Sequence, residues 1–146
     1  MRAGLSSVYE QMGWVADDIH SESASRTLDY SCEYVGSLLL RSFHKHLIDD
    51  DFAVSVLAGL LNKTTEQVFF RERAMNNPFT IFNPATGFME ARNASGAWAG
   101  PDNGWTEGDK WAYTFNVVHD IPGLIEHKGG NKSFVDFLDE HFDAGE

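Results

Sequence analysis

The stretch FAVSVLAGLL, residues 52 to 61, decides the fold class because its apolar side chains recur at helical spacing. Phe52, Val56 and Leu60 fall on one face of a helix. The residues that widen this face are Val54, Leu57 and Leu61. The stretch therefore predicts an amphipathic helix that packs one side against a core.

Helices are also predicted on both sides of this stretch. Before it, residues 21 to 30 form a helical pattern that Ser21 or Ser23 is placed to cap. After it, Thr64 or Thr65 is placed to cap a further helix, which fades at an Asn-Asn-Pro sequence. No alternating strand pattern and no internal repeat rises above background, so the chain is predicted to be all-α.

A glycine-rich loop is predicted between these helices and the C-terminal part of the chain. Residues 83 to 105 contain four glycines and two prolines, which favour turns throughout. Long ordered loops within compact domains often carry function. This loop is therefore a candidate for carrying function.

Two helices are predicted after the loop. The first runs from Thr106 toward Val118, because Thr106 and Asp109 resemble a capping box. Its expected apolar stripe consists of Trp111, Phe115 and Val118. The second spans about Lys132 to Phe142. Its expected inward residues are Phe134, Phe137, Leu138 and Phe142.

Composition limits the classes of partner. The 146 residues fit about one domain, and the net charge of -11 without a Lys/Arg cluster argues against binding to nucleic acid. No run approaches the length of a membrane span, so no membrane partner is expected. The single cysteine excludes an internal disulfide.

Three glycosylation sequons favour the secretory route. They begin at Asn62, Asn93 and Asn131, and two of them fall in predicted turns. The first twenty residues lack the apolar core of a signal peptide. We therefore expect a piece of a longer, secreted or secretory-pathway protein.

Glu107 stands out because it lies between two tryptophans and beside two glycines, in GWTEGDKWAYTF, residues 104 to 115. If it occupies the first turn of the predicted helix, the helix dipole favours its charged form. Burial against Trp105 or Trp111 would instead favour the protonated form that a general acid needs. A carboxylate just after a threonine cap also stabilises a helix without any catalytic role, so both interpretations stay open.

Several motifs together resemble glycoside hydrolase family 92. They are Gly13-Trp14, the ESASRTLDY sequence of residues 22 to 30, Gly87-Phe88-Met89 with Arg92, Thr106-Glu107-Gly108 with Trp111 and Tyr113, and His119-Asp120 with Gly123-Leu124. The resemblance covers nearly the whole chain except residues 32 to 49. It implies calcium-dependent, inverting exo-α-mannosidases that combine a β-sandwich with an (α/α)6 barrel. Residues 1 to 146 would then be a fragment of the catalytic domain, folded as a partial (α/α)6 barrel with long glycine-rich loops.

The resemblance also implies roles for individual residues. Glu107 matches the acid of the family's Thr-Glu-Gly motif, which donates a proton to the leaving sugar. Asp109, Trp111 and Tyr113 are the candidates for binding the substrate, a mannose-containing glycan with α-1,2 linkage. Met89 and Arg92 could line the same loop, although we favour structural packing for them, and His119 and Asp120 are expected to brace the barrel.

The general base and the calcium ligands of the family lie downstream of the matching motifs. We therefore assign no base and no metal ligand within this chain. We expect calcium to be bound elsewhere in the parent protein, meaning the longer protein of which this chain would be a piece. An inverting glycosidase needs both an acid and a base. The isolated chain is accordingly expected to be inactive, and uncovered helix faces should make it aggregate.

Residues 32 to 49, CEYVGSLLLRSFHKHLID, interrupt the family pattern. We favour a translated intron, because the first codons can contain the splice donor GTGAGT and the last codons an acceptor AG. Excision would give TLDYSYDDFAVSVLAGLL, a continuous helical pattern. The alternative is a genuine insertion such as a helical hairpin. If the intron hypothesis holds, Cys32, His44 and His46 carry no function.

Three interpretations follow. The chain is a piece of a secreted α-mannosidase with Glu107 as general acid, or an inactive truncated product that retains carbohydrate or partner binding, or an unrelated helical barrel or interaction module. A downstream base in the surrounding gene would favour the first interpretation over the third.

Overall fold

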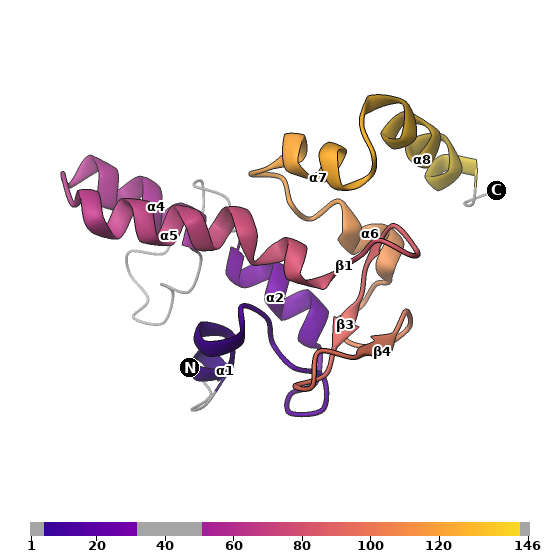
Figure 1. Cartoon of the computed structure of the whole chain (residues 1–146), viewed down its shortest axis with the longest axis horizontal. Coiled ribbons are helices and arrows are strands. Elements are labelled where there is room, and N and C mark those ends of the chain that lie inside the picture. The colour runs from indigo at the N-terminus through magenta and orange to yellow at the C-terminus, as the bar shows by residue number, and fades with distance from the viewer. Residues whose placement is uncertain (1–4, 32–50, 144–146) are drawn as a thin grey trace.

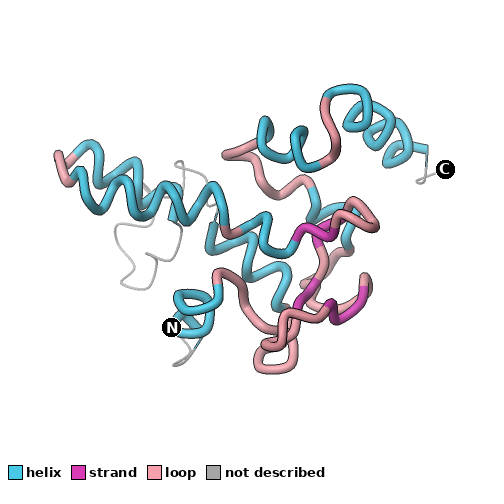
Figure 2. Tube along the Cα trace, viewed as in Figure 1, coloured by secondary structure: helices cyan, strands magenta, loops and turns pink. Residues whose placement is uncertain are grey.

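The computed structural model describes residues 5–31 and 51–143. The segment 32–49, with Cys32, His44 and His46, lies outside the described residues. Most of the described chain is helical (Figures 1 and 2). Its helices are α1 (Leu5–Met12), α2 (Ser23–Ser31), α4 (Asp51–Leu60), α5 (Thr64–Asn76), α6 (Lys110–Thr114), α7 (Ile121–His127) and α8 (Asn131–Asp143), with the 3-10 turn η1 (Pro78–Ile81). None of these helices is long and apolar enough to cross a bilayer.

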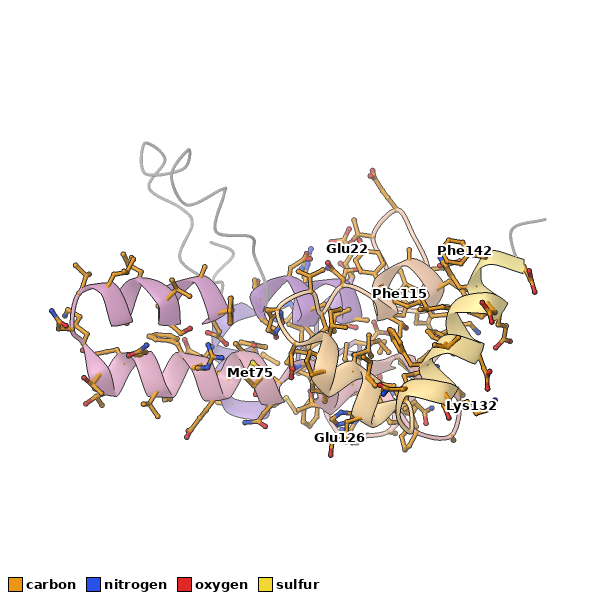
Figure 3. The ribbon with its side chains drawn as sticks, turned by 90° about the horizontal axis from the view of Figure 1, so that it is seen from above. Glu22, Met75, Phe115, Glu126, Lys132 and Phe142 are labelled. Carbon is orange, nitrogen blue, oxygen red and sulfur yellow. The ribbon has the colours of Figure 1, made fainter. Side chains whose placement is uncertain are left out.

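Helices α4 and α5 form an antiparallel hairpin that projects from the rest of the chain. The two helices run side by side in both views (Figures 1 and 3). The apolar spacing of residues 52 to 61 is confirmed as a helix, and α5 ends at Asn76 as predicted. The predicted threonine cap is wrong, because Lys63 occupies the N-cap without a side-chain bond and Thr64 is already helical.

The glycine-rich loop contains short strands, so the all-α prediction is incomplete. Strand β1 (Phe82–Asn83) pairs antiparallel with β2 (Phe88–Met89), and β3 (Ala91–Arg92) pairs with β4 (Trp98–Gly100). Each strand is two or three residues long, too short for an alternating pattern to be recognised in sequence. Gly87 and Gly96 close the two turns with positive φ angles that glycine adopts without strain.

The main core lies where α2, the two small sheets and the C-terminal helices meet. Its buried apolar members are Ala24, Leu28, Ile81, Phe82, Met89, Ala91, Val117 and Leu124. Partly buried aromatic rings surround it, among them Trp14, Trp105 and Tyr113. The core therefore fixes the position of the residues that follow β4, including the turn that carries Glu107.

The C-terminal helices differ from the prediction at their ends. The helix expected from Thr106 to Val118 is only α6, five residues long, and Val118 is exposed. Helix α8 lies close to the predicted span and buries Phe137. Phe142, expected to face inward, is 72% exposed. Helix α7 was not predicted, since Pro122 marked a helix end in sequence but in fact lies in the first turn.

Candidate functional site

Glu107 lies in a turn between β4 and α6 and not on a helix, which corrects the sequence prediction. Its side chain is exposed and its backbone is left-handed, with φ of 54°. Helix α6 begins only at Lys110, because Asp109 is the N-cap and its Oδ1 accepts from the amide of Ala112 at 3.0 Å. Asp109 takes the capping role that was expected of Thr106.

The residue before Glu107 is held from both sides. The amide of Thr106 donates to Ser25 Oγ at 2.9 Å, and the hydroxyl of Tyr113 donates to the carbonyl of Thr106 at 2.6 Å. Ser25 also donates its own amide to the carbonyl of Gly104 at 3.0 Å. Helix α2 on one side and α6 on the other therefore fix the turn that carries Glu107.

The two glycines that flank Glu107 are required by close packing. A Cβ at Gly104 would lie 2.7 Å from Ser23 Oγ and 2.8 Å from the Cβ of Ala91. A Cβ at Gly108 would lie 2.9 Å from Cε2 of Tyr113. Gly104 also has a φ of 80°, which side chains rarely tolerate. The glycines let the turn approach α2 and the Tyr113 ring closely.

Trp105 and Tyr113 form an aromatic pair next to this turn. Their rings stack with centroids 5.3 Å apart at an interplanar angle of 25°. The indole of Trp105 donates to the carbonyl of Pro101 at 2.8 Å, which fixes its orientation. Both rings are half-buried and pack against the core. This pair gives the turn an apolar base while Glu107 itself remains exposed.

Trp111 is directed to a different cluster. Its ring lies 4.6 Å from Phe88 and 5.3 Å from Phe137, centroid to centroid, with the ring of His141 5.7 Å away. These contacts join α6 to β2 and α8. Of the predicted substrate-binding residues, Asp109 and Tyr113 therefore adjoin the Glu107 turn, whereas the described contacts of Trp111 are with the aromatic cluster around α8.

Lys128 is a residue of this aromatic cluster that was not recognised in sequence. Its amine lies 3.0 Å from the ring centroid of Phe137 and donates to the carbonyl of Gly87 at 2.9 Å. Burial lowers the pKa of Lys128 to about 8, and the charge of Glu140 opposes part of that shift. No sequence motif marks it, because its environment is assembled from distant segments.

The weaker sequence candidates have structural roles. Met89 is buried in the core. The guanidinium of Arg92 lies 4.7 Å from the ring of Trp14 and 4.8 Å from that of Trp98. His119 Nε2 lies 2.8 Å from the carbonyl of Ala74, which ties the segment before α7 to α5. That His119 braces a barrel stays a prediction.

Asp120 is the N-cap of α7. Its Oδ1 accepts from the amide of Gly123 at 3.0 Å. Asp120 and His119 therefore both hold the start of α7 in place.

Ser25 is the residue at the turn to which sequence reasoning gave no role. It lay within the ESASRTLDY motif, and its burial is nearly complete. The available signal was the run of small hydroxyl residues in α2, which are buried although polar; they are Ser23, Ser25, Thr27 and Ser31. Buried hydroxyls need partners, so such a run indicates bonds to another segment.

No group of three or more His, Cys, Asp or Glu side chains in residues 5–31 and 51–143 is arranged to hold a metal ion. Calcium requires six to eight oxygen ligands, which the described acidic residues do not provide together. The described part of the chain therefore offers no fit for the calcium ion that the resemblance implies, and we derive no chemical step through it.

The sequence comparison identifies one family. The model of the glycosyl hydrolase family 92 catalytic domain matches residues 42–146. No curated protein matches the chain significantly.

Solved structures give a consistent result. The family 92 α-mannosidase BT3965 of Bacteroides thetaiotaomicron is 28% identical to this chain, with a TM-score of 0.77 over 96% of it. The same enzyme in complex with mannoimidazole gives 28% identity and a TM-score of 0.74 over 92%. The inverting mannosidase BT2199 of the same organism is 26% identical, with a TM-score of 0.73 over 91%. This chain spans only 17%, 17% and 16% of those three chains, respectively.

Proposed function

Because this chain belongs to glycosyl hydrolase family 92, we propose that it forms part of the catalytic domain of an α-mannosidase. The observation that carries this proposal is the family match together with the similarity to solved mannosidases at 26% and 28% identity. The interpretation of the chain as an unrelated helical module is thereby set aside. We further propose that its helices belong to an (α/α)6 barrel completed by the rest of the parent protein.

We propose that Glu107 is the general acid of the parent enzyme. The exposed carboxylate is held in a left-handed turn, and such strained backbone often occurs at functional sites. In the proposed step the carboxylic acid of Glu107 gives its proton to the glycosidic oxygen as the bond from that oxygen to the anomeric carbon breaks. Water attacks the opposite face of the sugar and loses its proton to a carboxylate base, which inverts the anomeric centre.

The base would come from outside this chain. We propose that the mannoside has an α-1,2 linkage within a mannose-containing glycan and that the parent enzyme requires calcium. Both proposals rest on the family resemblance. The proposed contacts with substrate at Asp109, Trp111 and Tyr113 rest on that resemblance and on closeness to Glu107 in sequence; in the structure, Asp109 and Tyr113 also adjoin the turn.

We propose that the parent protein enters the secretory pathway. The acceptor residues of two sequons, Asn62 and Asn131, are exposed, and Asn62 lies at the tip of the α4–α5 hairpin. The third, Asn93, is half-buried in the turn between β3 and β4. Expression with a secretion signal in eukaryotic cells should give a product whose mass falls after glycan removal, and Asn62→Gln should lower the number of glycans.

An inactive product is the alternative for the isolated chain, and one observation favours it. The α4–α5 hairpin leaves large apolar side chains uncovered, among them Leu60, which is 77% exposed, and Phe69. Monomeric proteins rarely leave such side chains clustered in water. We therefore propose that the chain needs further parts of the family 92 domain for activity, and an assay of the chain alone with calcium should detect no mannoside hydrolysis.

The proposed role of Glu107 is tested in a complete family 92 protein that contains this chain. Glu107→Gln keeps the shape of the side chain but removes the acid. We expect hydrolysis of a mannose disaccharide to fall about 100-fold or more, since its leaving group requires protonation. Hydrolysis of a dinitrophenyl mannoside should fall much less, because that leaving group departs without a proton.

Glu126→Gln, an exposed glutamate on α7, is the matched control and should leave both rates unchanged. Equal rates of disaccharide hydrolysis for Glu107→Gln and the unaltered enzyme would refute the role of Glu107 as general acid.

A further inference from the structure

We propose that Ser25 and Tyr113 are positioning residues that fix the direction of Glu107; this proposal rests on the function proposed for Glu107. Neither residue needs to touch the substrate to do so. Both act through Thr106, the residue directly before the acid, which they bind at its amide and at its carbonyl.

Planarity of the peptide unit explains how a bond to Thr106 reaches Glu107. The carbonyl of Thr106 belongs to the same planar unit as the amide nitrogen of Glu107. When the hydroxyl of Tyr113 holds that carbonyl at 2.6 Å, it also sets the position of the Glu107 Cα atom. The left-handed φ of 54° at Glu107 then determines where its side chain leaves the turn.

Ser25 holds the other side of Thr106. Its hydroxyl accepts from the amide of Thr106 and its own amide donates to the carbonyl of Gly104, so two polar groups of one residue hold the same turn. Ser25 lies 81 positions before Thr106 in sequence, and almost no part of it is exposed. Ser25, a buried serine near the start of α2, thus uses both its hydroxyl and its amide to bind the turn that carries Glu107.

The ring of Tyr113 limits movement of the turn from the opposite side. It stacks on Trp105 and lies so close to Gly108 that a Cβ there would clash with it. The Tyr113 ring therefore restricts the turn at Trp105 and at Gly108, whereas the side chain of Glu107 stays exposed. A loss of either hydrogen bond would allow the Thr106 peptide groups to rotate while the stacked rings stay in place.

The test uses Ser25→Ala and Tyr113→Phe in the complete family 92 protein, with kcat and KM measured on two substrates. Small displacements of a catalytic group strongly reduce rates, so we expect kcat for a mannose disaccharide to fall about tenfold or more. KM should change little, because both substitutions remove only a hydroxyl that is bonded to Thr106, and phenylalanine keeps the Tyr113 ring for the proposed substrate contact. For a dinitrophenyl mannoside kcat should stay within about twofold of the unaltered enzyme, because that reaction does not depend on proton donation.

Matched controls separate positioning from general damage to the fold. Ser55→Ala removes a buried serine hydroxyl that bonds the carbonyl of Phe52, and Tyr9→Phe removes a buried tyrosine hydroxyl, both away from the turn. These variants should keep the ratio of the two rates. Ser25→Thr, which retains the accepting oxygen, should restore the disaccharide rate that Ser25→Ala loses.

A second measurement is independent of activity. In the complete family 92 protein, the Cα and Cβ chemical shifts of Glu107 report its backbone conformation. They should move toward averaged values in Tyr113→Phe and stay unchanged in Tyr9→Phe.

Glu107→Gln is assayed in the same series. If Glu107→Gln loses disaccharide hydrolysis but Ser25→Ala and Tyr113→Phe keep it, the positioning proposal is overturned while the role of Glu107 stands. If Glu107→Gln keeps it, the proposed function fails as well. Equal losses on both substrates would also overturn the positioning proposal, because the two residues would then support the fold and not the proton donor.

Discussion

Ser31 and Asp51, which flank the segment of residues 32–50, meet at a single hydroxyl group. The hydroxyl of Tyr9 donates to Asp51 Oδ2 at 3.0 Å and lies 3.1 Å from Ser31 Oγ. The end of α2 and the start of α4 are therefore adjacent, and the two helices follow one another along one direction in both views (Figures 1 and 3).

Burial continues in helical register across this junction. If one tyrosine replaced residues 32–49, as intron excision would give, Ser31 and Asp51 would stand three positions apart on one helix face. One set of buried residues shares a helix face: Ala24, Leu28 and Ser31 before the junction, and Asp51, Ser55 and Ala58 after it. Each would lie three or four positions from the next in the joined chain, which is the spacing of one continuous buried stripe.

We predict that replacing residues 32–49 by one tyrosine leaves the fold intact. The joined helix needs no new contact, and a shorter connection lowers the entropic cost of folding. Helix content measured by circular dichroism should be retained, and the melting temperature should be equal or higher. Loss of cooperative unfolding in this variant would contradict the continuous helix and favour a genuine insertion that the fold requires.

Tyr9→Phe should destabilise the chain by about 1–3 kcal/mol, the usual cost of removing a partner from a buried polar group. Asp51 is 2% exposed and would keep the Nε of Arg73, at 3.1 Å, as a partner while losing the Tyr9 hydroxyl. Urea unfolding measures the change. In an Asp51→Asn background the effect of Tyr9→Phe should be smaller, because the two residues are coupled; equal effects in both backgrounds would refute the coupling.

The periodic spacing of apolar residues made helix α4 predictable from the sequence, whereas the backbone geometry at Glu107 made the start of α6 unpredictable. Helix α4 was found from the spacing of Phe52, Val56 and Leu60, since burial of one face gives that pattern directly. The start of α6 was misplaced because a left-handed residue, Glu107, follows Thr106, and sequence patterns do not reveal such a φ angle.

The partners of the site depend on contacts between distant segments. Ser25 and Thr106 are bonded across 81 positions, and the hydroxyl run in α2 indicates bonds to another segment without specifying which residue is bound. Trp111 and Tyr113 are two positions apart on α6 and point to different clusters, one toward Phe137 and one toward Trp105. The family resemblance made Glu107 the candidate acid and Asp109, Trp111 and Tyr113 the candidates for substrate binding, whereas the direction of each side chain required the fold.

Glu107→Gly should stabilise the chain while abolishing the proposed acid function. A residue with a Cβ in the left-handed region costs about 1 kcal/mol, and glycine removes that cost. The free energy of unfolding should therefore rise by about 1 kcal/mol, whereas Glu107→Ala should give no such gain. Asn62→Gly, in the turn between α4 and α5, is the matched control, because Asn62 is also left-handed with a φ of 57°. It should gain less, because asparagine tolerates this conformation, and should leave activity unchanged.

Lys128 should make the chain more stable at alkaline pH. Because burial lowers the pKa of Lys128 to about 8 from an ordinary 10.5, the unfolded state binds more protons than the folded state between these values. The free energy of unfolding then rises with pH across this window. Burial raises the pKa of Tyr9 above its ordinary value of 10, which opposes the rise at higher pH. Urea unfolding between about pH 7.5 and 9.5 tests the effect.

Lys128→Met keeps an aliphatic side chain against Phe137 and removes the titrating amine, so the rise should disappear. Lys132→Met, an exposed lysine on α8, should retain it. A rise that persists in Lys128→Met would show that another group is responsible.

His119 should make the chain less stable at acidic pH. Burial lowers the pKa of His119 below its ordinary value of 6.5, and the charge of Arg71 acts in the same direction. The Nε2 atom must donate to the carbonyl of Ala74, so Nδ1 carries the lone pair, and it is buried without a partner among the described residues. Protonation would place a charge there, beside the ring of Phe52, 5.3 Å away between centroids.

The sign follows from proton binding. Below about pH 6.5 the unfolded state binds a proton at this histidine before the folded state does, so the free energy of unfolding falls as pH falls toward the folded pKa. His119→Gln replaces the ring by an amide that can donate to Ala74 and does not titrate, and it should weaken this dependence between about pH 7.5 and 5. His20→Gln removes a histidine from the loop before α2 and should leave the dependence intact. Equal slopes in His119→Gln and the unaltered chain would contradict the assignment to His119.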